Sequence, residues 1–143
     1  MKIKLTRVEV QTRKDKELID ITPEVERLVT ESGVQDGMVF VLTTHTSSGI
    51  IVTEGLPCLE HDILANLERL APDHGDYLHN RYLDFDGRIA YNAGSHLKSV
   101  IGGYNCFFPI EQGRVVRGSR QTVYFAEYDG PLARTYAVQV MGE

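Results

Sequence analysis

Histidines and carboxylates that could do chemistry are spread through the middle of the sequence. The five histidines are His45, His61, His74, His79 and His96. Imidazoles from His61, His79 and His96 would suit Zn²⁺ or a similar divalent ion, and a carboxylate from Asp62 or Glu54 would complete the ligand set. Their spacing forms no compact motif such as H-E-x-x-H, so the sequence alone leaves open whether these side chains meet.

His45 and Glu54 lie on either side of a turn of small residues in the stretch LTTHTSSGIIVTEG. Because β-branched residues are frequent on both sides of the turn, residues 38–54 are expected to form a hairpin. Pairing across this hairpin would bring Glu54 close to the residues just before His45. An ordinary structural hydrogen bond would also explain a histidine on a strand, and both interpretations stay open.

Two groups of hydrogen-bond donors could hold an anion. His96 and Lys98 fall at the start of an expected short helix, where free backbone N–H groups and the helix dipole favour negative charge. Ser119, Arg120 and Gln121 form a second group between two expected strands. An exposed lysine and a polar β-turn would give the same patterns, so phosphate binding is one of two interpretations for each group.

Changes in the spacing of apolar residues along the sequence predict the helices and strands that must position these residues. Alternating residues predict a first hairpin over 3–21. Thr22 followed by Pro23 predicts the start of a helix that Gly33 ends. Apolar residues at spacings of three and four predict a second helix over 56–70, with His61 nearly opposite its apolar stripe.

The predicted order is two strands, a helix, two strands, a helix, a long loop, a short helix and then three or four strands. We therefore expect one α+β domain over residues 1–143, with a mixed, mainly antiparallel sheet or sandwich and about three helices. The loop over residues 72–92 is of a length that is usually functional inside a compact domain.

Composition narrows the classes of function. The chain has 143 residues, 42% of them hydrophobic, and a net charge of −5. This charge argues against nucleic-acid binding, and no apolar run is long enough to cross a bilayer. The first residues lack the apolar block of a signal peptide, so a cytoplasmic protein is expected. Cys58 and Cys106 belong to no C-x-x-C pair and are expected to be buried.

Six short motifs, taken in order, resemble the secondary thiamine-phosphate synthase family, also called YjbQ-like proteins. They are HTSSGIIVTEG, HD, YLHN, SHLK, GSRQ and EYDGP. The resemblance runs from about Gly37 to the end of the chain. It implies an α+β subunit that forms a homotrimer, with a metal- and phosphate-binding site near the subunit boundaries. It also implies a thiamine-phosphate synthase activity, in which hydroxymethylpyrimidine diphosphate is joined to a thiazole phosphate and pyrophosphate leaves.

The resemblance also gives each candidate residue an expected role. His45 and Glu54 are expected to transfer a proton or to orient a ligand. The metal ligands, for Zn²⁺ or Mg²⁺, are expected to be His61, His79 and His96, with Asp62 and Glu127 in support. The residues expected to bind phosphate are Thr46, Ser47, Lys98, Ser119, Arg120 and Gln121.

Two other functions fit the same residues. One is a metal-dependent hydrolase of a phosphorylated small molecule, with metal-bound water as nucleophile and Glu54 as base. The other is a trimer that binds a metal or a ligand without catalysis. Product analysis with both thiamine precursors separates the synthase from these alternatives.

Overall fold

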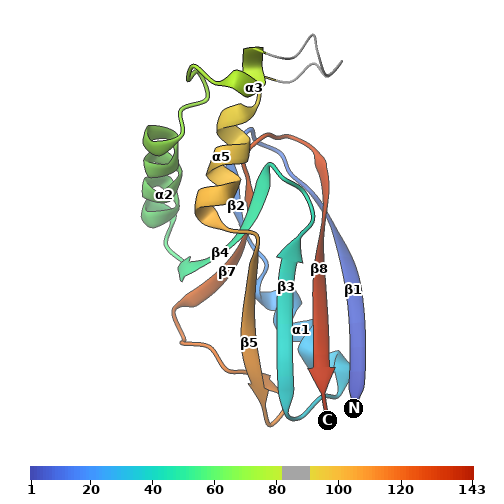
Figure 1. Cartoon of the computed structure of the whole chain (residues 1–143). Helices are drawn as coiled ribbons and strands as arrows, with labels where there is room; N and C mark the ends of the chain where they lie inside the picture. The colour runs from blue at the N-terminus through green and yellow to red at the C-terminus, as the bar shows by residue number, and fades with distance from the viewer. Residues whose placement is uncertain (82–90) are drawn as a thin grey trace.

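The structure is a computed structural model that describes residues 1–81 and 91–143. Figure 1 shows its elements in chain order. They are β1 (Lys2–Gln11), β2 (Glu17–Asp20), α1 (Thr22–Ser32), β3 (Gly37–Thr43), β4 (Ser48–Glu54), α2 (Pro57–Leu70), α3 (Leu78–Arg81), α5 (Ala93–Gly102), β5 (Asn105–Glu111), β6 (Arg114–Val115), β7 (Gln121–Glu127) and β8 (Ala133–Gly142).

Two antiparallel sheets form the framework. The large sheet has the strand order β1-β8-β3-β5-β6, and the small sheet has the order β2-β7-β4. The main core combines residues of both sheets with the apolar side of α1, for example Val138, Phe125 and Val25. A second apolar cluster, around Leu67 and Tyr128, joins α2 to the small sheet. The predicted α+β fold with mainly antiparallel sheets is therefore confirmed.

The helix α1 begins almost where its sequence predicts. Thr22 is the first helical residue and Ile21 takes the N-cap position, so the predicted cap is displaced by one residue. The Thr22 hydroxyl instead accepts a hydrogen bond from the backbone N–H of Val123 at 2.8 Å, which ties the helix to β7. Gly33 ends α1 with a φ of 75°, a left-handed conformation that glycine adopts without strain.

Both predicted hairpins are wrong. Strands β1 and β2 lie in different sheets, and so do β3 and β4. β3 pairs with β5 and β8, whereas β4 pairs with β7. The chain therefore passes from one sheet to the other after β1 and again after β3. The apolar core lies between the two strands of each expected hairpin. β-branched density indicates a strand but does not identify its partner.

The second predicted helix is confirmed as α2, and its histidine lies opposite the apolar stripe. The side chain of His61 is 82% exposed. The long predicted loop contains the short helix α3, which brings the number of helices in the described residues to four. Cys58 is exposed, contrary to expectation, whereas Cys106 is half-buried and burial raises the pKa of its thiol to about 12.

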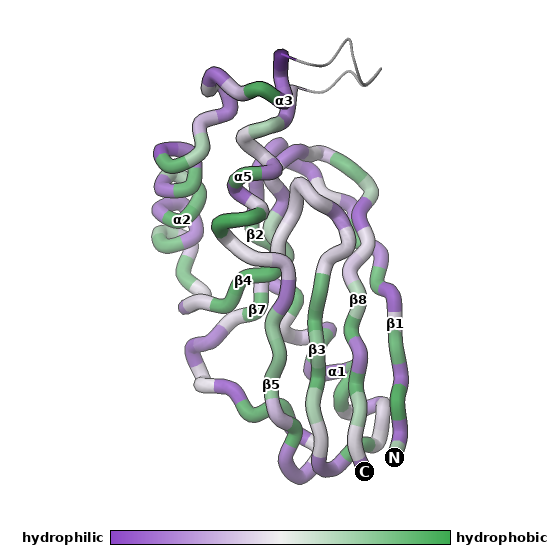
Figure 2. Tube along the Cα trace, viewed as in Figure 1, coloured by the Kyte–Doolittle hydropathy of each residue, from purple (hydrophilic) through white to green (hydrophobic). Residues whose placement is uncertain are grey.

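The outer face of the large sheet carries neighbouring apolar side chains. Strand register aligns Leu5, Gln139, Phe40 and Phe107 in one row across four strands, and Ile3, Met141, Met38 and Pro109 in the next row. Ile3 and Phe107 are 63% and 62% exposed. Figure 2 shows hydrophobic positions recurring along β1, β3 and β8. Among the described residues, no helix has the length and apolar character needed to cross a membrane.

Candidate functional site

The segment that leads from β3 in the large sheet to β4 in the small sheet forms one wall of a pocket. Its residues 44–47 are called the crossing loop below. The pocket has a volume of about 580 Å³, and the other walls come from α5 and the residues that follow it. Its lining residues are Thr43, Thr44, His45, Thr46, His96, Ser99, Val100, Gly103 and Tyr104.

Hydrogen bonding defines the protonation of His45 in this pocket. Its Nε2 accepts a hydrogen bond from the backbone N–H of Thr135 at 3.1 Å. Because a backbone N–H can only donate, the ring proton must lie on Nδ1. Burial lowers the pKa of His45, and the nearby charge of Arg134 lowers it further. His45 is therefore a neutral ring that can donate a hydrogen bond through Nδ1.

In His96, the second histidine of the pocket, the protein bonds the other ring nitrogen. Nδ1 of His96 lies 2.9 Å from the carbonyl oxygen of Thr46, which can only accept, so this nitrogen carries a proton. In the neutral ring the lone pair is then on Nε2, which has no hydrogen-bond partner among the described residues. The ring of His79 packs edge-on against His96, with centroids 5.2 Å apart. The pocket is thus lined by two imidazoles of opposite hydrogen-bonding character, since Nδ1–H of His45 can donate and Nε2 of neutral His96 can accept.

A buried ion pair lies behind the crossing loop. Arg134 on β8 is 6% exposed, and Glu127 at the end of β7 is fully buried. Nε and Nη2 of Arg134 donate to the two carboxylate oxygens of Glu127 at 2.8 and 2.6 Å. Burial favours a higher pKa for Glu127, but hydrogen bonds from Arg134, Asp129 and Thr12 hold this pKa below its usual value. Glu127 is therefore ionised and fully engaged within the protein.

Ser47 and Thr46 lie next to each other in the crossing loop but have different surroundings. Ser47 is buried, and its Oγ accepts a hydrogen bond from Nη2 of Arg134 at 2.9 Å. Its carbonyl accepts a hydrogen bond from the backbone N–H of Tyr128 at 3.2 Å. Thr46 is exposed at the pocket. Of these two predicted phosphate ligands, the structure places Thr46 at the pocket and ties Ser47 to the protein interior.

Lys98 is fully buried on the side of α5 that faces α2. Its ammonium group donates to the carbonyl of Ala71 at 2.6 Å, to Asp73 at 2.8 Å and to Glu68 at 2.9 Å. An ammonium group has three donors, and these contacts use all of them. The predicted phosphate-binding role of Lys98 is therefore not supported, because its charge is neutralised within the chain.

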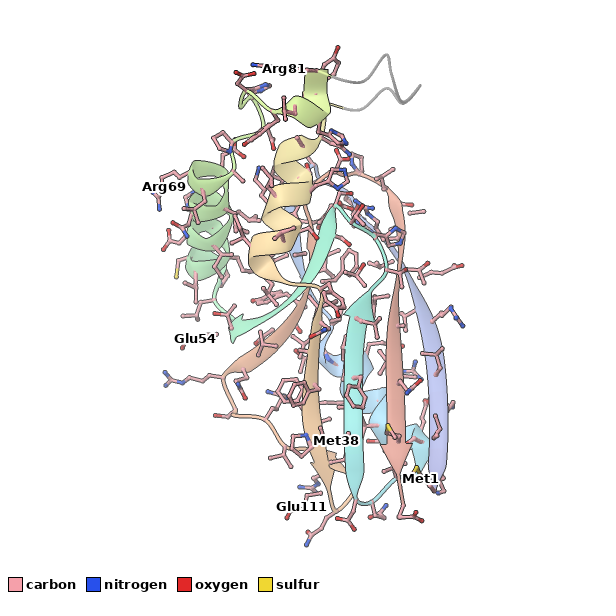
Figure 3. The ribbon with its side chains drawn as sticks, in the orientation of Figure 1. Met1, Met38, Glu54, Arg69, Arg81 and Glu111 are labelled. Atoms are coloured by element: carbon pink, nitrogen blue, oxygen red, sulfur yellow. The ribbon has the colours of Figure 1, made fainter. Side chains whose placement is uncertain are left out.

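Glu54 lies at the end of the small sheet away from the pocket, together with the donor group of Ser119, Arg120 and Gln121. Glu54 pairs with Gln121, whereas Ser48, at the pocket end of β4, pairs with Glu127. Six residues along a strand correspond to about 20 Å. Glu54 contacts Arg120 at 3.3 Å on the surface, and Figure 3 shows it at the end of β4 that leads into α2. Within one chain, the expected His45–Glu54 pair does not form.

The predicted site therefore divides into two parts. Glu54, Ser119, Arg120 and Gln121 form an exposed or half-exposed corner, in which Gln121 accepts a hydrogen bond from the backbone N–H of Gly118 at 2.7 Å. His45, Thr46 and His96 line the pocket at the opposite end.

The three predicted metal ligands are not brought together within the chain. His79 and His96 are in contact, but His61 projects from the exposed side of α2, where its nearest charged neighbour is Asp62 at 3.5 Å. Over residues 1–81 and 91–143, no three His, Cys, Asp or Glu side chains form a group that could hold a metal ion. A site with three protein ligands would need residues beyond 1–81 and 91–143 or from another copy of the chain.

A larger cavity of about 700 Å³ lies beside the N-terminal end of α5. Its lining residues are Asp15, Lys16, Asp73, His74, Gly75, Asn80, Tyr91, Ser95 and Asp129. None of the residues expected to act on a ligand lines this cavity.

Arg134 is the main residue that the motifs did not reveal. It shares the inward face of β8 with Tyr136, Val138 and Val140, all of which are buried. An arginine at an inward position of an alternating strand must have a buried partner, because an unpaired buried charge is very costly. This pattern in ARTYAVQV was the available signal.

Together, the fold and the pocket describe a two-sheet α+β domain with a histidine-lined site between the crossing loop and α5. A family model described as UPF0047 protein YjbQ-like matches residues 6–143, and the chain belongs to this family. A UPF0047 protein from Archaeoglobus fulgidus is 38% identical over 132 residues, covering 92% of this chain and 97% of the relative. A UPF0047 protein from Methanocaldococcus jannaschii is 32% identical over 140 residues, covering 97% and 95%.

Solved structures share the whole fold. A YbjQ-like protein of unknown function from Sulfolobus solfataricus superposes with a TM-score of 0.92 at 31% identity, covering 99% of both chains. An uncharacterised conserved protein of the same family from Clostridium acetobutylicum superposes with a TM-score of 0.86 at 36% identity, covering 95% of this chain and 99% of that one. The family relationship is therefore clear in both sequence and structure.

Proposed function

We propose that this protein is a thiamine-phosphate-synthase-type transferase that uses the pocket of His45 and His96. The opposite hydrogen-bonding polarity of these two imidazoles is the observation that carries the proposal. A pocket of about 580 Å³ is within the range that binds small metabolites. The exposed hydroxyl of Thr46 adds a donor suited to a phosphorylated substrate.

The proposed reaction forms a carbon–nitrogen bond and breaks a carbon–oxygen bond. The thiazole nitrogen attacks the methylene carbon of hydroxymethylpyrimidine diphosphate with its lone pair. The bonding pair of the departing C–O bond moves onto the pyrophosphate oxygen. No proton has to be removed from the nucleophile, so the chief task of the protein is to stabilise charge on the leaving group.

Residues of the pocket suit this task. The Nδ1–H of His45 and the hydroxyls of Thr44 and Thr46 can donate to pyrophosphate oxygens. Nε2 of His96 can accept a hydrogen bond from a substrate N–H or O–H and so orient it. Because His45 is held neutral, it acts as a hydrogen-bond donor rather than as a base in this scheme.

A divalent ion remains part of the proposal, although the described residues do not form a three-ligand site. Such an ion would neutralise charge on the pyrophosphate. With the ion bound, Nε2 of His96 would coordinate it instead of accepting a substrate hydrogen bond, and His79 would supply a second nitrogen ligand, a donor type that suits Zn²⁺ better than Mg²⁺. The remaining ligands would come from substrate oxygens or from another copy of the chain. No step of the reaction above depends on the ion.

We also propose that the chain assembles as a homotrimer. The rows of apolar side chains on the outer face of the large sheet support self-association, because exposed contiguous apolar patches usually mark interfaces. Tyr104 and Val100 line the pocket and are 58% and 79% exposed. A second copy that covered them would narrow the pocket entrance.

The test supplies both thiamine precursors and measures thiamine phosphate by mass spectrometry. We expect product with the wild type and a decrease on the order of a hundredfold in His45→Gln or His96→Gln. His45→Asn is the informative comparison, because its amide N–H lies near the position of Nδ1 and should preserve part of the activity. His61→Gln is the matched control on the exposed side of α2.

Failure of this test would direct attention to the other two functions. Release of phosphate from a metabolite panel, without thiamine phosphate, would establish a hydrolase. The location of Glu54 disfavours its proposed role as the base of such a hydrolase within one chain. Saturable pyrophosphate binding without turnover of any substrate would establish a ligand-binding protein.

A further inference from the structure

Two consecutive residues of β8 hold the crossing loop from behind. Nη2 of Arg134 donates to Oγ of Ser47 at 2.9 Å and to its carbonyl oxygen at 3.3 Å. The backbone N–H of Thr135 donates to Nε2 of His45 at 3.1 Å. One short piece of the large sheet therefore sets both the position of the loop backbone and the orientation of the His45 ring.

The arginine itself is fixed by Glu127, which other residues hold in place. Its guanidinium group forms a two-pronged hydrogen bond with Glu127 at the end of β7. Glu127 also accepts hydrogen bonds from Oγ1 of Thr12 at 2.8 Å and from the backbone N–H of Asp129 at 2.9 Å. A planar guanidinium held at two points has little freedom to rotate, so its Nη2 is a rigid support for Ser47.

We propose that Arg134 is a positioning residue for the pocket, which holds Ser47 so that the neighbouring His45 keeps its Nδ1–H facing the ligand. The proposal extends the proposed function, because its catalytic consequence requires that His45 contacts the substrate. The effect of Arg134 on His45 itself can be observed without any substrate. The charge of Arg134 also opposes protonation of His45, which agrees with a neutral donor.

A purely structural ion pair is the competing explanation. In that case Arg134 would stabilise the contact between the two sheets, and the state of the His45 ring would not depend on it. Arg134→Lys separates the two explanations, because lysine keeps the charge but cannot bond both Glu127 oxygens and Ser47 in the same geometry. Ser47→Ala provides a milder second variant, which removes one hydroxyl and leaves the Arg134–Glu127 pair intact.

The experiment records long-range proton–nitrogen NMR spectra of the histidine rings in the full-length protein at pH 8. We expect the wild-type spectrum to show His45 with its proton on Nδ1. In Arg134→Lys we expect the His45 signals to shift and broaden as the ring exchanges between both tautomers, with a smaller change in Ser47→Ala. Arg117→Lys is the matched control, because Arg117 forms another Arg–Glu pair, with Glu26 at 2.6 Å.

Each outcome decides the proposal. Unchanged His45 signals in a folded Arg134→Lys protein would overturn it. If that variant does not fold, Ser47→Ala decides, and unchanged His45 signals there would overturn the proposal as well. A change of His45 that also appears in Arg117→Lys would show general loosening and would count against a specific role.

An activity measurement tests whether Arg134 also affects catalysis. If the synthase reaction is found, Arg134→Lys should lower kcat on the order of tenfold to a hundredfold with a smaller change in KM, as expected for a misplaced catalytic group. Altered His45 spectra without any synthase activity in the wild type would support the positioning role while refuting the proposed function. Failure of the positioning role of Arg134 can therefore be distinguished from failure of the proposed function.

Discussion

Lys98 and His96 stand two residues apart on α5, and their side chains project to opposite sides of the helix. His96 contacts the carbonyl of Thr46 in the crossing loop, whereas Lys98 donates to Ala71 and Asp73 beyond the end of α2. Two helical residues are separated by about 200° around the axis. One side of α5 therefore anchors the helix, and the other side forms part of the pocket.

Replacing Lys98 by methionine should destabilise the protein rather than remove a ligand contact. Methionine leaves the Ala71 carbonyl without its donor and leaves Asp73 and Glu68 without their shared cation. Loss of a buried ion-pair partner costs about 3 kcal/mol when, as here, the remaining carboxylates are partly exposed to water. Urea denaturation measures this loss, with Lys14→Met as an exposed control.

The same variant examines the phosphate-binding role that the sequence suggested. Isothermal titration with pyrophosphate should give a similar affinity for folded Lys98→Met and wild type. A folded variant with unchanged stability and abolished pyrophosphate binding would contradict the structural assignment of Lys98.

Stability should depend on pH through His45. The folded protein holds the pKa of His45 below the value of about 6.5 that it has in an unfolded chain. The unfolded state therefore binds a proton first as pH falls, and this contribution to stability is lost below about pH 6.5. Denaturation curves at pH 7.5 and 5.5 should show a smaller difference in His45→Gln than in the wild type, by at most about 1.4 kcal/mol per pH unit. An equal difference in both proteins would show that His45 is not held neutral.

Glu54→Gln should have little effect on the pocket. Glu54 is about 20 Å from the pocket end of β4, and its exposed contact with Arg120 contributes less than about 1 kcal/mol. Pyrophosphate affinity should stay within about twofold of the wild-type value in a titration. A large loss of affinity would mean that the Glu54 corner of one chain completes the pocket of another.

Zinc binding should depend on His79 and His96 but not on His61. Competition with a chromophoric chelator measures the affinity. Removal of either contacting imidazole, in His79→Ala or His96→Ala, should weaken binding about tenfold or more, whereas His61→Ala should leave it unchanged. Equal losses in all three variants would place His61 at the ion, as the sequence predicted, through an assembly of several chains.

Self-association should require the outer face of the large sheet. Phe107→Glu introduces a charge into the apolar row that Phe40 and Leu5 share, so it should weaken assembly at least about tenfold. Light scattering coupled to gel filtration measures the mass. Leu70→Glu changes a comparably exposed apolar residue on α2 and serves as the control. Monomers with Leu70→Glu, and intact assemblies with Phe107→Glu, would place the interface on α2 instead.

Local patterns in the sequence identified most of the individual elements. Periodicity located α2, and a glycine after the last apolar position of α1 marked its end at Gly33. The same period correctly placed His61 away from the apolar stripe of α2. These features depend on contacts within a few residues along the chain, so a single sequence contains the necessary information.

Strand partners were not predictable in the same way. The expected hairpin around the crossing loop placed Glu54 beside His45, but β4 pairs with β7, whose residues lie about 70 positions later in the chain. Two strands with similar β-branched composition can pair with each other or pack across a core, and their propensities do not distinguish these arrangements. The expected pairing brought Glu54 toward His45, whereas in the structure Glu54 lies at the other end of the small sheet.

The roles of buried charged residues were also difficult to predict from the sequence. Lys98 looks like a surface lysine near a helix start, and only the three-dimensional approach of Asp73 and Glu68 explains its burial. Arg134 differs from Lys98, because its inward position on β8 could have been read from the local alternation of the strand. The short motifs drew attention away from that pattern. Charged residues need partners that are usually distant in sequence, and that is why their roles were the least predictable.

Both ends of the crossing loop are hydrogen bonded to the large sheet, and the Ser47 end is also bonded to a residue beside the small sheet. The ring of His45 is hydrogen bonded to Thr135 in the large sheet, whereas the carbonyl of Ser47 is bonded to Tyr128 just beyond the small sheet's central strand. Because Ser47 also accepts hydrogen bonds from Arg134, sliding of one sheet over the other must distort the hydrogen bonds at this residue. A relative movement of the two sheets would therefore reach the crossing loop at Ser47, two residues from His45.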